Sequence, residues 1–122
     1  MRVIIADDSD ILRSRLVETL TEIEGIEIVA EARDTREAIE KILVHQPDVL
    51  IIDIRMPGKD GIFAIEAIKK AKKGKPKIIV FTNYPYLQYR KRCVEAGADF
   101  FFYKALEFEK LVALIKQLSQ RN

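Results

Sequence analysis

Five short apolar runs alternate with longer segments of helical periodicity along this chain. Runs of four to seven residues have the length of strands, and each segment between them is long enough for a helix. The alternation predicts an α/β protein of five βα units, (βα)5, in which a doubly wound parallel sheet carries helices on both faces. The predicted strands are 2–6, 26–32, 48–53, 77–82 and 100–103, and the predicted helices are 10–24, 34–45, 62–72, 85–96 and 107–120.

The hydropathy of two runs indicates how exposed each strand is. The run 48–53 is apolar throughout its interior, as expected of a central strand that is covered on both faces. The run 26–32 alternates between apolar and polar residues, which indicates a partly exposed strand. Of the two common doubly wound orders we adopt the flavodoxin-like order, 2-1-3-4-5.

Local residues predict where the helices begin and end. Asp8, Ser9 and Asp10 offer side-chain oxygens to cap the first helix, and Gly25 suits a left-handed residue at its end. Pro85 is expected to open the fourth helix. The apolar residues of the first helix are expected to share one inward stripe made of Ile11, Leu12, Leu16, Leu20 and Ile23.

Length and composition indicate one ordinary globular domain. The chain has 122 residues, of which 48% are hydrophobic and 33% charged, and its net charge of +2 points neither toward nor away from nucleic acid. The single cysteine, Cys93, cannot form an internal disulfide. No apolar run reaches the roughly 18 residues of a membrane span, and no signal peptide precedes the first strand. We expect residues 1–122 to be one cytoplasmic domain without an output domain.

Polar residues that could bind a ligand or take part in a reaction stand at the ends of four of the predicted strands. Asp7 and Asp8 follow the first, Asp53 the third, Thr82 closes the fourth and Lys104 follows the fifth. The carboxyl ends of parallel strands share one edge of the sheet, and ligands bind there. Because neighbouring strands lie about 4.8 Å apart, these side chains are expected to converge on one small patch.

Three carboxylates at such short distances from one another repel each other. At about 4 Å and an effective dielectric near 20, each like-charge pair costs roughly 4 kcal/mol. Lys104 supplies one positive charge, which does not balance three negative ones. Either a further cation neutralises them or a proton stays on a carboxyl group, and a hard dication would do better than the lysine alone. Mg²⁺ commonly takes one or two carboxylates with water and phosphate oxygens, and a carboxylate beside it is a competent nucleophile toward phosphorus. The residues therefore suit phosphoryl transfer.

With these positions and the loop Met56-Pro57-Gly58-Lys59-Asp60-Gly61, the chain resembles the receiver domain of response regulators in two-component signalling over essentially its whole length. The resemblance implies that Asp53 is the phosphoacceptor and that Asp7, Asp8 and Asp53 bind Mg²⁺ with the backbone carbonyl of Arg55. It also implies that Thr82 hydrogen-bonds the phosphoryl group and Lys104 pairs with it. Phe101, three residues before the lysine, falls at the family's aromatic switch position.

The same resemblance implies partners and a non-enzymatic role. The phosphodonor is expected to be a sensor histidine kinase or a phosphotransfer protein, and the domain catalyses only its own phosphorylation and dephosphorylation. A downstream protein is expected to bind the face made by the fourth helix, the fifth strand and the fifth helix, where Arg90, Lys91 and Arg92 offer positive charge. We expect no direct nucleic-acid contact, no membrane insertion, and a monomer or a phosphorylation-dependent dimer.

One departure from the family pattern concerns the residue after the lysine. The family has proline there, joined by a cis peptide, whereas Ala105 follows Lys104 in this chain. A cis bond to a non-proline residue costs about 3 kcal/mol. We expect a cis bond so that Lys104 reaches the phosphoryl group; the alternative is a trans bond with a reshaped loop.

Two other functions remain open from the residues. A Mg²⁺-dependent phosphohydrolase of the haloacid-dehalogenase type would also pass through an aspartyl-phosphate. That class has a general acid/base two residues after its nucleophile, where this chain has Arg55. A purely structural interaction module that takes no phosphate would not need the three acids, the hydroxyl and the lysine together.

Overall fold

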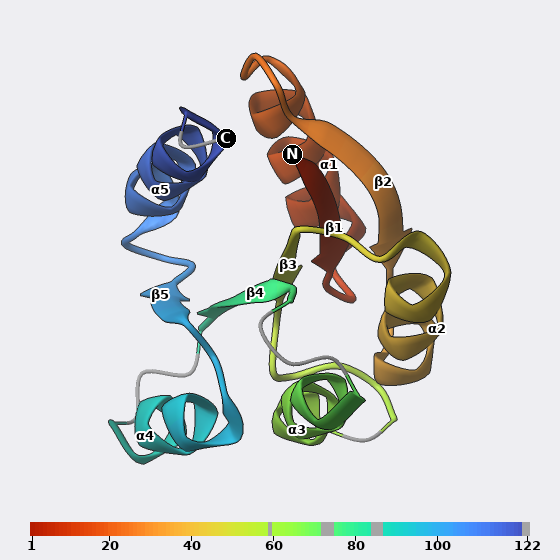
Figure 1. Ribbon diagram of the computed structural model, residues 1–122. Helices are drawn as coiled ribbons and strands as arrows, with labels where there is room; N and C mark the ends of the chain where they lie inside the picture. Colours follow the sequence, from red (N-terminus) through yellow and green to blue (C-terminus); the bar gives the residue numbers. More distant parts are fainter. Residues whose placement is uncertain (59, 72–74, 84–86, 121–122) are drawn as a thin grey trace.

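The structure is a computed structural model that describes residues 1–58, 60–71, 75–83 and 87–120. One five-stranded parallel sheet forms its centre, and the strand order β2-β1-β3-β4-β5 confirms the predicted order and fold class (Figure 1). The elements are β1 (Arg2–Ala6), α1 (Asp10–Thr21), β2 (Glu27–Ala32), α2 (Thr35–His45), β3 (Val49–Ile52), α3 (Gly61–Ala71), β4 (Lys77–Thr82), α4 (Leu87–Ala96), β5 (Phe100–Tyr103) and α5 (Phe108–Gln120).

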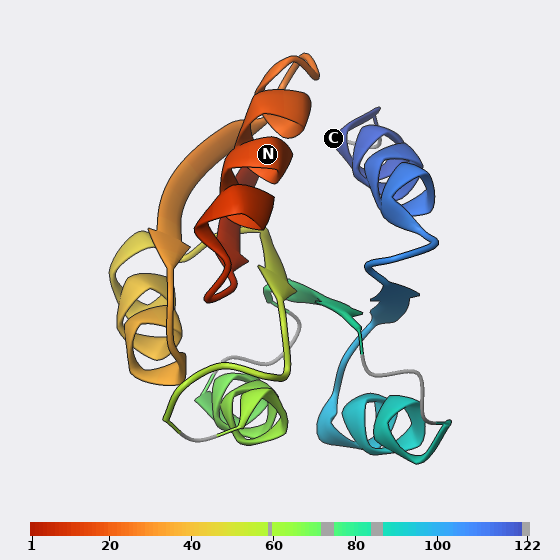
Figure 2. The same ribbon diagram turned by 180° about the vertical axis from the view of Figure 1, so that it is seen from behind.

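The helices cover the two faces of the sheet unequally. α1 and α5 lie on one face, and α2, α3 and α4 lie on the other, as the two opposite views show (Figures 1 and 2). Alternate strand residues pack into the two layers: Ile5 and Ile51 join the α1–α5 layer, whereas Ile4 and Ile52 join the other. The period of two along each strand therefore divides the core into two hydrophobic layers.

The central and edge strands differ as the sequence predicts. Every residue of β3 is buried, and this strand pairs with both β1 and β4. β2 pairs with β1 and is largely half-exposed. The parallel register places Ala6 beside Ile52 and Thr82 beside Tyr103, so the residues that follow these strands emerge at one edge.

The inward stripe of α1 differs from the predicted one. Leu16 and Leu20 are buried as predicted, but Ile11 is 85% exposed, and Arg13 takes the buried position one turn before Leu16. A helix turns about 100° per residue, so Ile11 lies about 140° around the helix from Leu16. Spacing from the two central leucines, rather than apolar character alone, decides which residue faces the sheet.

Several predicted boundaries hold and others shift. Ser9 caps α1, because its Oγ accepts a hydrogen bond from the Leu12 amide at 3.2 Å. The prediction that α1 reaches Glu24 is wrong: the helix ends at Thr21, and Gly25, with φ of 87°, lies in the turn that follows. Lys72 and Pro85, predicted to bound two helices, lie outside the described residues. Within the described residues, each helix is too short or too polar to cross a membrane.

Candidate functional site

Three aspartates meet at the carboxyl edge of the sheet. Asp7 and Asp8 follow β1, and Asp53 follows β3, where its amide donates to the Ala6 carbonyl at 2.9 Å. One carboxylate oxygen from each lies within 4.8 Å of the other two. Asp7 and Asp53 are 3% and 5% exposed, whereas Asp8 is open to solvent. The pairing of β1 with β3 therefore builds the predicted acidic cluster.

Lys104 joins two of these carboxylates from the end of β5. Its Nζ lies 2.5 Å from Asp7 Oδ2 and 2.5 Å from Asp53 Oδ2. The prediction of a cis bond between Lys104 and Ala105 is wrong, since Lys75–Pro76 is the one cis peptide bond in the part of the chain that the structure describes. The four-carbon side chain of Lys104 spans the gap from a trans backbone, so the costly isomer is not needed.

Backbone amides orient the same two carboxylates from the other side. The Ser9 amide donates to Asp7 Oδ1 at 2.8 Å, and the Arg55 amide donates to Asp53 Oδ1 at 2.9 Å. In each case the donor lies two residues after the aspartate, in the turn that leaves the strand. Each buried carboxylate is thus held between one amide and the shared ammonium group.

In the part of the chain that the structure describes, the ammonium group of Lys104 is paired with two of the three carboxylates. Burial raises the pKa of Asp7 above its usual value, although hydrogen bonds from Lys104 and Ser9 act in the opposite direction. Burial also acts to lower the pKa of Lys104, but its hydrogen bonds to Asp53 and Asp7 outweigh this and raise it. Three carboxylates facing one ammonium form a hard, oxygen-rich site whose chemistry fits Mg²⁺.

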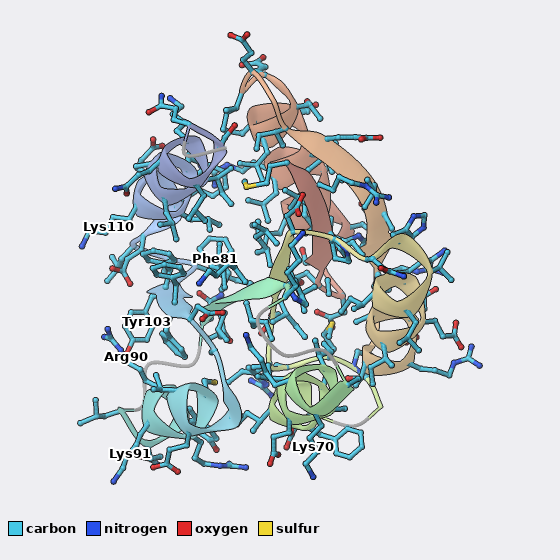
Figure 3. The ribbon with its side chains drawn as sticks, viewed as in Figure 1. Lys70, Phe81, Arg90, Lys91, Tyr103 and Lys110 are labelled. Atoms are coloured by element: carbon cyan, nitrogen blue, oxygen red, sulfur yellow. The ribbon has the colours of Figure 1, made fainter. Side chains whose placement is uncertain are left out.

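Thr82 and Phe101 lie on neighbouring strands beside this cluster. Thr82 is fully buried at the end of β4, and its carbonyl accepts from the Lys104 amide at 2.9 Å. Phe101 is 7% exposed, and its ring meets the Tyr103 ring edge-on with centroids 5.3 Å apart. The Arg90 guanidinium lies 5.9 Å from the Phe101 centroid, and Figure 3 shows Arg90 and Tyr103 where α4 faces β5.

A polar hollow of about 310 Å³ lies between the loop that follows β3 and α4. Arg55 and Arg92 bring two guanidinium groups to it, and Asp60 brings a carboxylate. Asn83, the residue after Thr82, is exposed at the same edge of the sheet. The hollow is therefore lined by residues of both signs.

The sequence analysis did not select Arg13 as a site residue. The residue is 8% exposed, and its side chain donates to the Asp7 carbonyl at 2.5 Å. The signal was available, because residue 13 precedes Leu16 and Leu20 on the inward face of the helix. A charged residue on a buried stripe requires polar partners inside the fold.

Comparison with known proteins gives a consistent picture. The family model described as the response regulator receiver domain matches residues 3–116. The chain is 39% identical over 115 residues to the transcriptional regulatory protein PdtaR of Mycobacterium tuberculosis, a match that covers 94% of this chain and 55% of that protein. It is 33% identical to the oxygen regulatory protein NreC of Staphylococcus epidermidis, over 98% of this chain and 55% of NreC. The chain thus spans about half the length of these curated relatives.

Solved structures with similar folds include two proteins of bacterial signalling. A DNA-binding response regulator of the LuxR family from Staphylococcus aureus has a TM-score of 0.88 at 29% identity, over 97% of this chain and 98% of that one. A chain of the CheX-CheY-BeF3-Mg²⁺ complex from Borrelia burgdorferi has a TM-score of 0.87 at 30% identity. That match covers 97% of this chain and 88% of the other.

Proposed function

The chain belongs to the response regulator receiver domains of two-component signalling, and from this we propose that it is a phosphoacceptor switch whose acceptor is Asp53. The phosphodonor is a sensor histidine kinase or a phosphotransfer protein. One observation carries the proposal: the buried Asp53 carboxylate shares a site with Asp7, Asp8 and Lys104, all at the ends of different strands or in the turns that follow them. Buried charges of this kind are costly to desolvate, which favours a functional reason for bringing them together.

The proposed transfer forms one bond and breaks another. An Asp53 carboxylate oxygen attacks phosphorus, the bond from phosphorus to the donor's histidine nitrogen breaks, and an acyl phosphate results. Receiver domains generally bind Mg²⁺ at an acidic pocket, and here Asp7, Asp8, Asp53 and the carbonyl of Arg55 would hold the ion, which supplies positive charge to the phosphoryl oxygens. The Arg55 amide orients Asp53, and Lys104 is placed to pair with the transferred group.

Thr82 and Phe101 are proposed to convert phosphorylation into a change of surface. The new group brings roughly −1.5 to −2 charge to the end of β3. Thr82 ends β4, the strand beside β3, and its hydroxyl would hydrogen-bond the new group. In the structure the Phe101 ring is inward, and we assign this packing to one of two states of the switch. The face made of α4, β5 and α5 would then differ between the states and bind the downstream protein.

The remaining parts of the proposal concern partners and context. We propose that residues 1–122 act as one cytoplasmic receiver unit, as a monomer or as a dimer formed on phosphorylation. Relatives whose names include DNA binding or transcription suggest a genetic output, but direct nucleic-acid contact by this domain is not proposed. Lys69 and Lys75, two of its basic residues, are in ion pairs with Asp99 and Asp48.

A phosphodonor experiment tests the function. The protein is incubated with acetyl phosphate, with and without Mg²⁺, and its intact mass is measured. We expect a gain of one phosphoryl group that requires Mg²⁺ and is lost in Asp53→Asn. Asp48→Asn is the matched control, because Asp48 lies just before the same strand, at its opposite end. A phosphoryl group gained equally by Asp53→Asn would contradict the assignment, and multiple turnover of a small phosphomonoester would favour the phosphohydrolase.

A further inference from the structure

Arg13 is a buried charged residue that the proposed phosphoryl transfer does not use. It lies on the inward face of α1 in line with Leu16 and Leu20, and only 8% of it is exposed. Burying a guanidinium group is costly unless each part of it is hydrogen-bonded. A leucine at this position would complete the apolar stripe, so an arginine requires a separate explanation.

The guanidinium group bonds three acceptors with its three nitrogens. Nη1 donates to the carbonyl oxygen of Asp7 at 2.5 Å, Nε donates to Glu31 Oε1 at 3.1 Å, and Nη2 donates to Asp10 Oδ1. Glu31 lies on β2, whereas Asp7 directly follows β1. The planar fork of one arginine thus ties the start of α1 to the ends of two strands, which a lysine ammonium group cannot reproduce.

The bond to the Asp7 carbonyl acts on the acidic pair itself. That carbonyl belongs to the peptide that joins Asp7 to Asp8, and the Asp7 amide on its other side is bonded to the Ala32 carbonyl at 2.9 Å. The Asp7 carboxylate is also held by Ser9 and Lys104. Asp8 differs: among the described residues its carboxylate has no hydrogen-bond or ion-pair partner, so its direction depends on the backbone that carries it.

We propose that Arg13 is a positioning residue of the magnesium site: by fixing the peptide between Asp7 and Asp8 it aims the Asp8 carboxylate at the ion and sets the affinity for Mg²⁺. This inference rests on the proposed function, since it assumes that the acidic cluster binds the ion. Groups that orient metal ligands without touching the metal typically change affinity about 10- to 100-fold when they are lost.

Charge alone predicts a different outcome, which makes the inference testable. Arg13 is a cation near the ion site, and its removal leaves the negative charges of Asp10 and Glu31 uncompensated. If Arg13 acted only through its charge, Arg13→Gln would bind Mg²⁺ more tightly and Arg13→Lys would bind it as the parent protein does. If Arg13 positions the peptide, both variants bind Mg²⁺ more weakly.

Isothermal titration calorimetry of the metal-free protein at constant ionic strength measures the dissociation constant of Mg²⁺. Parent protein, Arg13→Lys and Arg13→Gln are compared with Arg15→Lys and Arg15→Gln. Arg15 is the matched control because it lies on the same helix, with its guanidinium 3.8 Å from the centroid of the Phe108 ring. Thermal unfolding of each protein without Mg²⁺ separates an effect on folding from an effect on the ion.

We expect both Arg13 variants to raise the dissociation constant about tenfold and both Arg15 variants to leave it unchanged. A lower unfolding temperature with unchanged Mg²⁺ affinity would show that Arg13 is merely structural and would overturn the inference, as would tighter binding by Arg13→Gln. A parent protein that binds no Mg²⁺ would overturn the proposed function as well.

Discussion

The carboxylates at the two ends of the sheet differ in their partners and in the direction of their pKa shifts. At the amino end, Asp48 accepts from the Arg2 amide and from Lys75, each at 2.8–2.9 Å, and these bonds lower its pKa. At the carboxyl end, burial raises the pKa of Asp7 although Lys104 lies 2.5 Å away. The first arrangement gives an acid its own amide and its own lysine, and the second makes acids compete for one lysine.

Asp99 extends the contrast at the amino end. Its Oδ2 accepts from the Ile78 amide at 2.8 Å and lies 3.3 Å from Lys69 Nζ, so it too has its own partners. Asp7 and Asp53 share Lys104, and Asp8 adds a third negative charge. Asp48 and Asp99 are each paired with a lysine of their own, whereas the acids that share Lys104 form the proposed cation site.

The largest predicted difference concerns the two lysines. Lys104→Ala should lower the free energy of unfolding of the metal-free protein by about 3 kcal/mol, because it leaves two buried carboxylates without their cation. Lys75→Ala should cost less than about 1 kcal/mol, because that side chain is 69% exposed. Urea unfolding measures both, and Mg²⁺ should reduce the difference from the parent protein for Lys104→Ala but not for Lys75→Ala. Equal losses would remove the distinction between the two ends.

Removal of one acid at each end should give changes of opposite sign. Asp7→Asn should raise the stability of the metal-free protein by on the order of 1 kcal/mol, because it removes a buried charge from a crowded site. Asp48→Asn should lower it by about 1 kcal/mol, because a charge-assisted bond to the Arg2 amide is lost. Unfolding temperatures with and without Mg²⁺ check both signs, and Asp7→Asn should also lose the stabilisation by Mg²⁺. Destabilisation by Asp7→Asn without metal would contradict the interpretation that the buried charge of Asp7 destabilises the metal-free protein.

The pH dependence of stability should separate the two carboxylates further. Because the folded state raises the pKa of Asp7 above 3.8, it binds that proton more tightly than the unfolded chain, and stability from this group is lost as the pH rises through the folded pKa. The lowered pKa of Asp48 gives the reverse: its stability is present above pH 3.8 and is lost as the pH falls through its folded pKa. The free energy of unfolding is measured between pH 3 and 7 for both variants. Asp7→Asn should flatten the fall in stability as the pH rises, and Asp48→Asn should flatten the fall in stability as the pH decreases. If Asp7→Asn leaves the limb above pH 4 unchanged, another group produces it.

Salt should produce the smallest change, and at one end only. The Debye length falls to about 3 Å at 1 M salt, so the exposed pair of Lys75 and Asp48 should lose a few tenths of a kcal/mol of coupling. Lys104 is 13% exposed and Asp7 4%, so their coupling should change less. Double-mutant cycles at low and high salt measure both couplings. Greater salt sensitivity of the buried pair would show that water reaches it freely.

Most of the fold and the acidic site could be predicted because both depend on local patterns. A polar residue directly after an apolar strand emerges at the carboxyl edge in any parallel sheet, so Asp7, Asp8, Asp53 and Lys104 needed only the strand order to be brought together. The cap at Ser9 and the buried β3 followed from equally local features. The functional role of the site remains a prediction that the phosphodonor experiment tests.

The errors share one cause, which is that they depend on neighbours distant in sequence. Ile11 was expected inside because it is apolar, but the direction in which α1 faces the sheet places Arg13 there. The Lys104–Ala105 bond was expected to be cis because the reach of a lysine side chain across β4 could not be measured from sequence. Arg13 itself was missed because Glu31, one of its acceptors, lies 18 residues away on β2.

The sequence by itself determined the alternation of strands and helices, the burial of β3 and the identity of the acids at the strand ends, because these depend on periods of two and 3.6 residues and on residue type. Only the tertiary structure decided that three acids share one lysine, that this lysine reaches them from a trans peptide, and that a buried arginine holds the peptide between two of the acids. Those properties arise from distances between atoms far apart in the chain, which exist only when the sheet has formed and the helices have packed against it.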